Sequence, residues 1–346
     1  MRPAKMTDSQ LSPASYTRQK KRKAGWLLIL LCGTVAGLFL CTAIGSVSIS
    51  ISSVWQGIFG LLTGQLVETD SLIAAMRLER IGAAFLAGAS LALAGCLMQA
   101  LLRNPLADPY ILGVSGGASV GAIAVLFFSA ACLAINIVAL VGAAVITVSL
   151  YLLSRRSFGS LHGTTQILLT GVMLAFGCGA LVTLMLTLAP AHDLRGMVFW
   201  LIGDLSGTPF SLTQFALLVI VLGWSWHQSN AINLLSRQAE MAASLGVPVA
   251  SLQKNLFALS AILTAVTVAE AGCISFVGMT VPHICRRIWG SDHRWLVPAS
   301  ALLGGLFLII ADTVARSVVS PIQLPVGAVT AIIGAPVFLF QLRKGG

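Results

Sequence analysis

The sequence predicts an all-α polytopic membrane protein of about ten transmembrane helices, with both termini in the cytoplasm. Of its 346 residues, 57% are hydrophobic and only 9% are charged, and the mean hydropathy is +0.93. A soluble domain carries about 25% charged residues, so this chain lacks the charge needed to cover a water-exposed surface. The composition therefore excludes a soluble enzyme, a disordered chain and a disulfide-rich secreted scaffold.

Apolar stretches long enough to cross a bilayer, which takes roughly 20 residues, follow one another along the chain. Bounded by Pro, Gly or charged residues, they predict helices at 26–47, 80–102, 113–129, 132–153, 164–188, 211–227, 255–271, 274–288, 295–317 and 327–342, with a short extra helix within 50–76. The division of 255–288 into two spans is the weakest, because the second is short and contains Pro282.

The chain begins with a basic tail over residues 1–23, and residues 24–346 form one transmembrane domain. The tail resembles the charged front of a signal peptide, but the following apolar run is too long for one and no convincing cleavage site ends it. We therefore interpret 26–47 as a retained helix. The seven cysteines form no CxxC pair, and neither a disulfide framework nor a metal site is predicted.

The positive charges support an even number of spans. With a cytoplasmic N-terminus, 17 of the 21 Lys and Arg residues fall on the cytoplasmic side, which leaves Arg77, Arg80, Arg195 and Arg316 outside. This asymmetry follows the positive-inside rule. It accounts for the net charge of +10 without a nucleic-acid partner. The lipid bilayer is the predicted surrounding.

Few residues offer chemistry of their own. The chain contains no phosphate-binding GxxxxGK[ST] motif and no pair of clustered carboxylates, so we expect no catalytic residue and no ATP hydrolysis on this chain. Intramembrane carboxylates are costly and usually functional, and Glu270 and Asp312 are the candidates. Asp312 precedes Arg316 by one helical turn, which favours a structural ion pair. The alternative is an ion-coupled secondary transporter that uses Glu270 and Asp312.

The longest internal polar segment, about 229–254, predicts a short amphipathic helix on the cytoplasmic face. Gly246 stops this helix, and Pro248 follows it. Such an element suits docking of a partner protein. A helical connector resting on lipid headgroups fits the pattern equally well.

Several motifs, taken together and in order, resemble one family. They are Arg77-Leu-Glu-Arg80, the stretch from Gly88 to Gly95, Arg103-Asn-Pro-Leu-Ala-Asp-Pro109, Leu112-Gly-Val-Ser-Gly-Gly-Ala118, Trp200-Leu-Ile-Gly-Asp-Leu205, Ala243-Ser-Leu-Gly-Val247, Gly272 to His283 and Leu324 to Pro336. The chain is similar, from about residue 26 to 344, to the permease subunits of ABC importers for iron-siderophores, haem and vitamin B12 (FecCD type).

The resemblance implies a bacterial inner-membrane permease that works as a dimer, here expected to be a homodimer. It implies two separate ATPase subunits, which bind ATP and Mg, and a periplasmic binding protein that delivers the cargo; this chain itself would bind no cofactor. The expected cargo is an iron chelate first, then haem or cobalamin. Alternating access would be driven by hydrolysis on the ATPase chains.

The resemblance also implies roles for individual residues. Arg77, Arg80 and Arg316, taken as exposed, match positions that dock the binding protein, since guanidinium groups pair with carboxylates. The coupling segment comprises Arg237, Glu240, Ala243, Ser244, Leu245, Gly246 and Val247. Asn104, Leu106 and Thr164 match cytoplasmic gate positions, although a simple capped turn explains them equally well. Glu270 departs from the family pattern, where that position is small and uncharged.

Overall fold

The computed structural model describes residues 13–45, 50–63, 69–129, 134–160, 163–319 and 322–343. Residues 1–12 of the predicted tail, Cys132 and Lys344 lie outside these ranges. The described chain is helical throughout, in agreement with the predicted class. The helices are α1 (Pro13–Ala43), α2 (Ile51–Thr63), α3 (Thr69–Leu101), η2 (Pro109–Leu112), α4 (Val114–Phe127), α5 (Ile135–Ser154), α6 (Gly163–Leu188), α7 (Ala191–Ile202), α8 (Leu212–His227), α9 (Ser229–Arg237), α10 (Ala239–Ser244), α11 (Val249–Ala271), α12 (Val277–Trp289), α13 (His293–Ser317) and α14 (Val326–Arg343).

Six of these helices are long and apolar enough to cross a membrane: α1 from Thr17, α3, α5, α6, α11 and α13. Shorter apolar helices are α4, α8 and residues 326–340 of α14. The remaining predicted span, 274–288, corresponds to α12, which has Pro282 inside it and Arg286 and Arg287 in its last turn. The total of ten spans stays a prediction.

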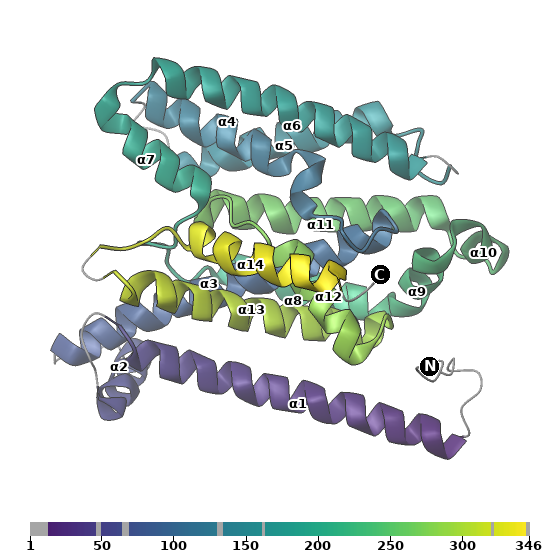
Figure 1. Ribbon diagram of the computed structural model, residues 1–346, viewed down its shortest axis with the longest axis horizontal. Coiled ribbons are helices and arrows are strands. Elements are labelled where there is room, and N and C mark those ends of the chain that lie inside the picture. Colours follow the sequence, from purple (N-terminus) through teal and green to yellow (C-terminus); the bar gives the residue numbers. More distant parts are fainter. Residues whose placement is uncertain are drawn as a thin grey trace.

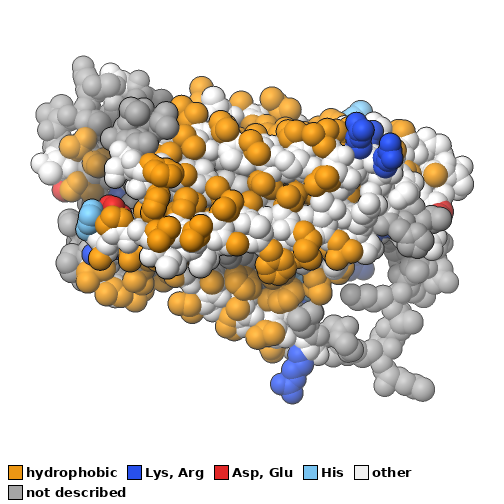
Figure 2. Space-filling view, turned by 90° about the horizontal axis from the view of Figure 1, so that it is seen from above, with side chains coloured by type: hydrophobic (Ala, Val, Ile, Leu, Met, Phe, Trp, Pro, Cys, Tyr) orange, Lys and Arg blue, Asp and Glu red, His pale blue; other side chains and the backbone are white. Residues whose placement is uncertain are grey.

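The long helices run side by side along the longest axis of the molecule (Figure 1). α2 and α7 lie at one end, and α9 and α10 lie at the other. The start of α1 and the end of α14 both lie toward the α9–α10 end. Figure 2 shows that hydrophobic side chains cover most of the middle of one face, as a bilayer requires, and that two adjacent basic side chains lie near one end of it.

The centre of the bundle is α3, which packs against α1, α2, α11, α12 and α13. Its contact with α13 depends on glycine, because a Cβ atom added to Gly88 would lie 2.2 Å from the carbonyl oxygen of Gly304. Small residues let helix backbones approach closely where lipid supplies no hydrophobic drive. α3 has 33 residues and is about 50 Å long, so it extends past the hydrocarbon region of a bilayer.

A second layer consists of α4, α5 and α6 (Figure 1). Gly117 and Gly121 form a GxxxG pair on α4 that faces α5. A Cβ atom on Gly117 would lie 2.4 Å from the carbonyl oxygen of Gly142, and one on Gly121 would lie 2.4 Å from that of Val138. The motif therefore lets α4 and α5 approach closely.

Several elements differ from the sequence prediction, and α1 and α11 begin earlier than expected, at Pro13 and Val249. The helix predicted at 80–102 begins at Thr69, so residues 69–76 belong to α3 and not to the preceding short helix. α7 was not predicted, because its twelve residues include charged residues and glycine and carry little periodic signal. The single amphipathic helix predicted in 229–254 is two helices, since Gln238 has extended backbone angles (φ −154°, ψ 132°).

Candidate functional site

At the α2–α7 end, a fully buried carboxylate joins two arginines from different helices. Asp312 of α13 is 0% exposed. Its Oδ1 accepts a 2.8 Å bond from Nη2 of Arg80 on α3, and its Oδ2 lies 3.0 Å from Nε of Arg316, one turn further along α13. The predicted Asp312–Arg316 ion pair is confirmed. The partner Arg80, 232 residues away in the chain, was not predicted.

The sequence-based description of the outer arginines as exposed is wrong for three of the four. Arg77 is 9% exposed, Arg316 is 8% exposed and the Arg80 side chain is 13% exposed. Arg77 donates to the carbonyl oxygen of Thr42 on α1 (3.3 Å). Arg195 is exposed and lies over the ring of Phe199. Hydrophobicity alone could not show this burial, because the contacts come from helices distant in sequence.

The arginine cluster borders an open cavity of about 650 Å³. Arg80 also donates to Oε1 of Gln323 (2.9 Å), and the Ser206 hydroxyl donates to Gln323 (3.0 Å). Arg77, Arg80 and Arg316 all line this cavity together with the exposed Glu79. The lining contains three arginines and one carboxylate, and Asp312 behind Arg80 and Arg316 adds a second carboxylate, so positive charges outnumber negative ones.

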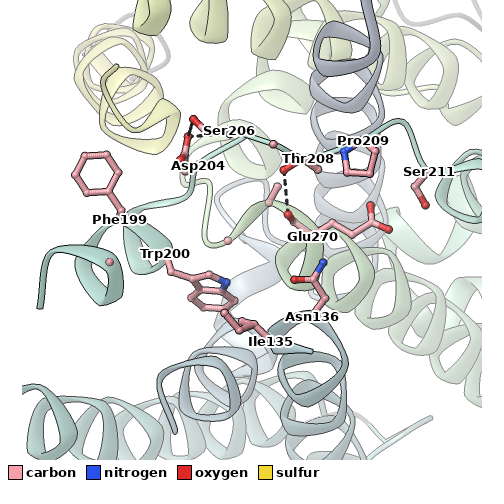
Figure 3. Close-up of a pocket in the computed structure, with 14 residues that line it drawn as sticks. Ile135, Asn136, Phe199, Trp200, Asp204, Ser206, Thr208, Pro209, Ser211 and Glu270 are labelled. Carbon is pink, nitrogen blue, oxygen red and sulfur yellow. Dashed lines mark hydrogen bonds between the residues drawn. The ribbon is translucent and has the colours of Figure 1, made fainter. Parts of the chain in front are cut away.

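A second cavity at the same end, of about 480 Å³, contains Glu270 (Figure 3). Glu270 is half-buried at the end of α11, and its side chain extends toward Ser211. Trp200 and Phe199 of α7 form the aromatic part of the lining, and residues 206–209 lie along both cavities. Glu270 and Asp312 do not share a cavity, and Asp312 is fully engaged by arginines. The arrangement does not form a paired carboxylate relay.

The predicted gate residues lie in a turn at the other end of α3. The Asn104 side chain accepts a 2.9 Å bond from the backbone N–H of Leu106, so it caps the turn, and both residues are exposed. Arg103 has a left-handed backbone (φ 50°), and its guanidinium lies 3.4 Å from the hydroxyl of Thr164 in the first turn of α6. The structure therefore places Thr164 beside the turn that holds Asn104 and Leu106, with Arg103 as the contact between them.

Gln99 fixes this turn to α12. Its amide donates to the carbonyl oxygens of Ala107 (3.3 Å) and Met279 (3.2 Å), and its oxygen accepts from Arg286. The buried amide thus links α3, the turn and α12 in one hydrogen-bonded unit. Sequence reasoning missed this residue, because a lone Gln in an apolar helix does not reveal its partners.

The predicted coupling segment forms an exposed projection. Glu240, Ala243, Ser244, Leu245 and Gly246 are all exposed, as is Arg237, and Val247 is half-buried; the Leu245 side chain is 60% exposed. Gly246 has φ 82°, and its N–H bonds to the carbonyl oxygen of Ala243 (3.0 Å). The prediction that Gly246 ends the helix is confirmed.

The projection is attached to α13 by hydrogen bonds. The side-chain amide of Asn233 on α9 donates to Oδ1 of Asp292 (2.8 Å). Its side-chain oxygen accepts from the backbone N–H of His293 (2.9 Å) and lies 2.7 Å from Nδ1 of the same histidine. Asp292 also caps α13 by accepting from the N–H of Arg294. α13 therefore joins the projection at one end to the Asp312 cluster at the other. An Asp before an apolar helix is a recognisable cap signal, but its bond to Asn233 was not predictable.

Comparisons with known proteins identify the family. Residues 31–344 match the model of the FecCD transport family. The chain is 37% identical over 333 residues to the vitamin B12 import system permease protein BtuC of Escherichia coli O17:K52:H18, covering 95% of this chain and 98% of the relative. It is 36% identical over 331 residues to the protein of that name from Salmonella typhimurium, covering 94% and 97%.

Solved structures agree. An inward-facing ABC transporter of metal-chelate type matches with a TM-score of 0.80 and 28% identity, covering 93% of this chain and 99% of the other. PsaBC from Streptococcus pneumoniae matches with a TM-score of 0.53 and 16% identity, covering 83% and 95%, which shows a shared fold. The chain belongs to the FecCD transport family and is a multi-pass permease subunit of an ABC importer of the FecCD/BtuC type.

Proposed function

We propose that this permease carries a cobalamin-type metal chelate from a periplasmic binding protein across the bacterial inner membrane into the cytoplasm. The observation that carries the proposal is the match along almost the whole chain to permeases named for vitamin B12 import. An iron chelate, the first expectation from the sequence, is the second candidate, supported by the metal-chelate type of the structural relative. The order of the two proposed cargoes is therefore the reverse of the order expected from the sequence.

Energy for transport enters at the α9–α10 projection. Its exposed Leu245 and Met241 offer apolar contacts, and Arg237 and Glu240 offer charges to an ATPase subunit. Two ATPase chains, one for each copy of a homodimeric permease, would bind ATP and Mg. Because Asn233 bonds the projection to the start of α13, a displacement of α10 is passed to a helix that crosses the molecule.

Passage of the cargo is controlled at the turn after α3. Asn104 and Leu106 are exposed at this turn, and Arg103 connects it to Thr164 of α6. A shift of α6 relative to α3 would change this contact and move the turn. Asn104 thus serves both as the cap of the turn and as part of the gate.

The binding protein docks at the outer cavity. Arg77, Arg80 and Arg316 give it net positive charge, although Asp312 neutralises part of that charge. A partner with acidic lobes would be steered to this end, since complementary charge speeds and orients encounter. Because the arginines are largely buried, they favour long-range attraction of the binding protein and filling of the cavity by it over ion pairs at the surface.

The cargo is tested by uptake in bacterial cells that lack their own vitamin B12 and siderophore permeases and express this chain with its ATPase and binding protein. We expect labelled cyanocobalamin to accumulate, and unlabelled cyanocobalamin to compete at least about tenfold better than ferric hydroxamate or haemin, a difference of ~1.4 kcal/mol. Accumulation of a ferric siderophore without cyanocobalamin uptake would transfer the assignment to iron.

A further inference from the structure

A groove of about 820 Å³ lies at the α9 end of the molecule, between α1, α8 and α13. Its apolar lining comes from all three helices: Leu27, Leu222, Trp226, Trp295 and Pro298. Trp226 is 60% exposed. Tryptophan is enriched at the boundary between hydrocarbon and headgroups. We therefore expect the groove to lie at the level where the carbonyl ends of the acyl chains join the headgroups.

The polar part of the groove is basic. Lys20 and Lys23 approach from α1 and Arg294 from α13, with His227 and Asn230 beside them. Arg294 donates to the Asn230 side chain. Among the described residues, neither lysine forms an ion pair.

Helical spacing selects which basic residues face the groove. The run at residues 20–23 is Lys-Lys-Arg-Lys. Lys20, Lys23 and Leu27 follow one face of α1 and line the groove, whereas Lys21 and Arg22 are exposed and do not line it. Two of four adjacent charges are therefore directed to one place, and two are not.

A neighbouring cavity of about 750 Å³ adds to the positive charge. It shares Gln19, Lys23 and Asp292 with the groove and is also lined by Arg103, Arg237 and Arg286. Asp292 is the one carboxylate lining either space in the described part of the chain, and it already accepts bonds from Asn233 and from the N–H of Arg294.

We propose that the groove binds one anionic phospholipid, with its phosphate between Lys20, Lys23 and Arg294 and an acyl chain along Leu27, Trp226 and Trp295. Phosphate oxygens accept charge-assisted bonds from ammonium and guanidinium groups, and basic pockets between transmembrane helices suit anionic headgroups. A free anion would use the basic part alone and leave the apolar walls uncovered. The site does not depend on the cargo or on ATP, so it stands apart from the proposed transport function.

The test is binding of phosphatidylglycerol and phosphatidylcholine to the full chain in a non-ionic detergent, followed by native mass spectrometry. We expect phosphatidylglycerol to bind about tenfold more tightly, as two or more cationic contacts allow. The double variant Lys20→Gln/Lys23→Gln should lose that preference. The matched variant Lys21→Gln/Arg22→Gln removes the same charge from the same turn of α1 and should keep it.

The proposal would be overturned by the absence of a preference for the anionic lipid. Equal loss in both double variants would also overturn it, because it would indicate general attraction to a basic helix. Displacement of the lipid by inorganic phosphate at equal concentration would show a free-anion site instead.

Contact with the acyl chain is measured separately, from quenching of tryptophan fluorescence by brominated phosphatidylglycerol. We expect the variant Trp226→Phe/Trp295→Phe to lose most of that quenching, and unchanged quenching would contradict the placement of the chain. The bond from Trp289 to the Lys23 carbonyl oxygen uses only the backbone of α1 and is therefore available in both double variants.

Discussion

At the scale of single residues, the key side chain is that of Asp312. It is fully buried between Arg80 of α3 and Arg316 of its own helix. A carboxylate held by two guanidinium groups is compensated, but removing it leaves two largely buried cations without a counter-charge. This arrangement assigns Asp312 to structure and leaves the ion-coupled transporter without one of its two carriers.

Asp312→Asn keeps the shape of the side chain and removes its charge. We expect the free energy of unfolding to fall by about 3 kcal/mol or more, measured as a lower thermal midpoint of the protein in detergent. The control is Glu79→Gln, which changes an exposed carboxylate in the cavity lined by Arg80 and Arg316 and should change the free energy of unfolding by no more than about 0.5 kcal/mol. If Asp312 carried ions, Asp312→Asn would abolish transport, but its thermal midpoint would match that of Glu79→Gln.

At the scale of elements, the contact between α3 and α13 sets the distance between the two central helices. Gly88 and Gly304 let the backbones touch, and a Cβ atom at position 88 has no free space. Gly33 of α1 is the opposite case, because nothing lies within 4 Å of its added Cβ atom.

Gly88→Ala should therefore destabilise the protein by about 1–3 kcal/mol through overpacking. Gly33→Ala should be neutral or stabilising by up to about 1 kcal/mol, because alanine has the higher helix propensity. The measurement is the thermal midpoint of both variants, and a midpoint of Gly88→Ala at or above that of the wild type would contradict the close contact.

The projection formed by α9 and α10 is expected to couple ATP hydrolysis on the ATPase chains to transport. Gly246 has φ 82°, which proline, fixed near −65°, cannot adopt, whereas asparagine tolerates the left-handed region. We expect Gly246→Pro to lower ATP-dependent uptake at least about tenfold, a coupling loss of ~1.4 kcal/mol, and Gly246→Asn to retain most of it. Equal uptake by the two variants would show that α10 does not transmit the ATPase motion.

On the scale of the whole molecule, two helices connect its ends. α13 runs from the bonds of Asn233 beside the projection to the Asp312 cluster at the α2–α7 end. α3 runs from Arg80 in that same cluster to Gln99, which holds the turn after α3. Because the two helices are in backbone contact at Gly88 and Gly304, we expect a displacement at one end to be transferred to the other.

The parts of this structure that depend on local sequence were predictable. The apolar spans, the Gly246 stop, the GxxxG contact and the Asp312–Arg316 pair all follow from spacing within one helix or turn. The bonds from Arg80 to Asp312, from Arg103 to Thr164 and from Asn233 to His293 join residues 60 to 232 positions apart. One sequence does not specify such pairs, since many helix arrangements would bury the same apolar faces.

The source of energy for transport tests the central claim most directly. The measurement is uptake of labelled cyanocobalamin by proteoliposomes that contain this permease with its ATPase and binding protein, with ATP inside or outside the vesicle and with an imposed proton or sodium gradient. We expect uptake to require ATP on the side that carries α9 and α10 and to be unaffected when the ion gradient is collapsed. Uptake that follows the gradient in the absence of ATP would contradict the account.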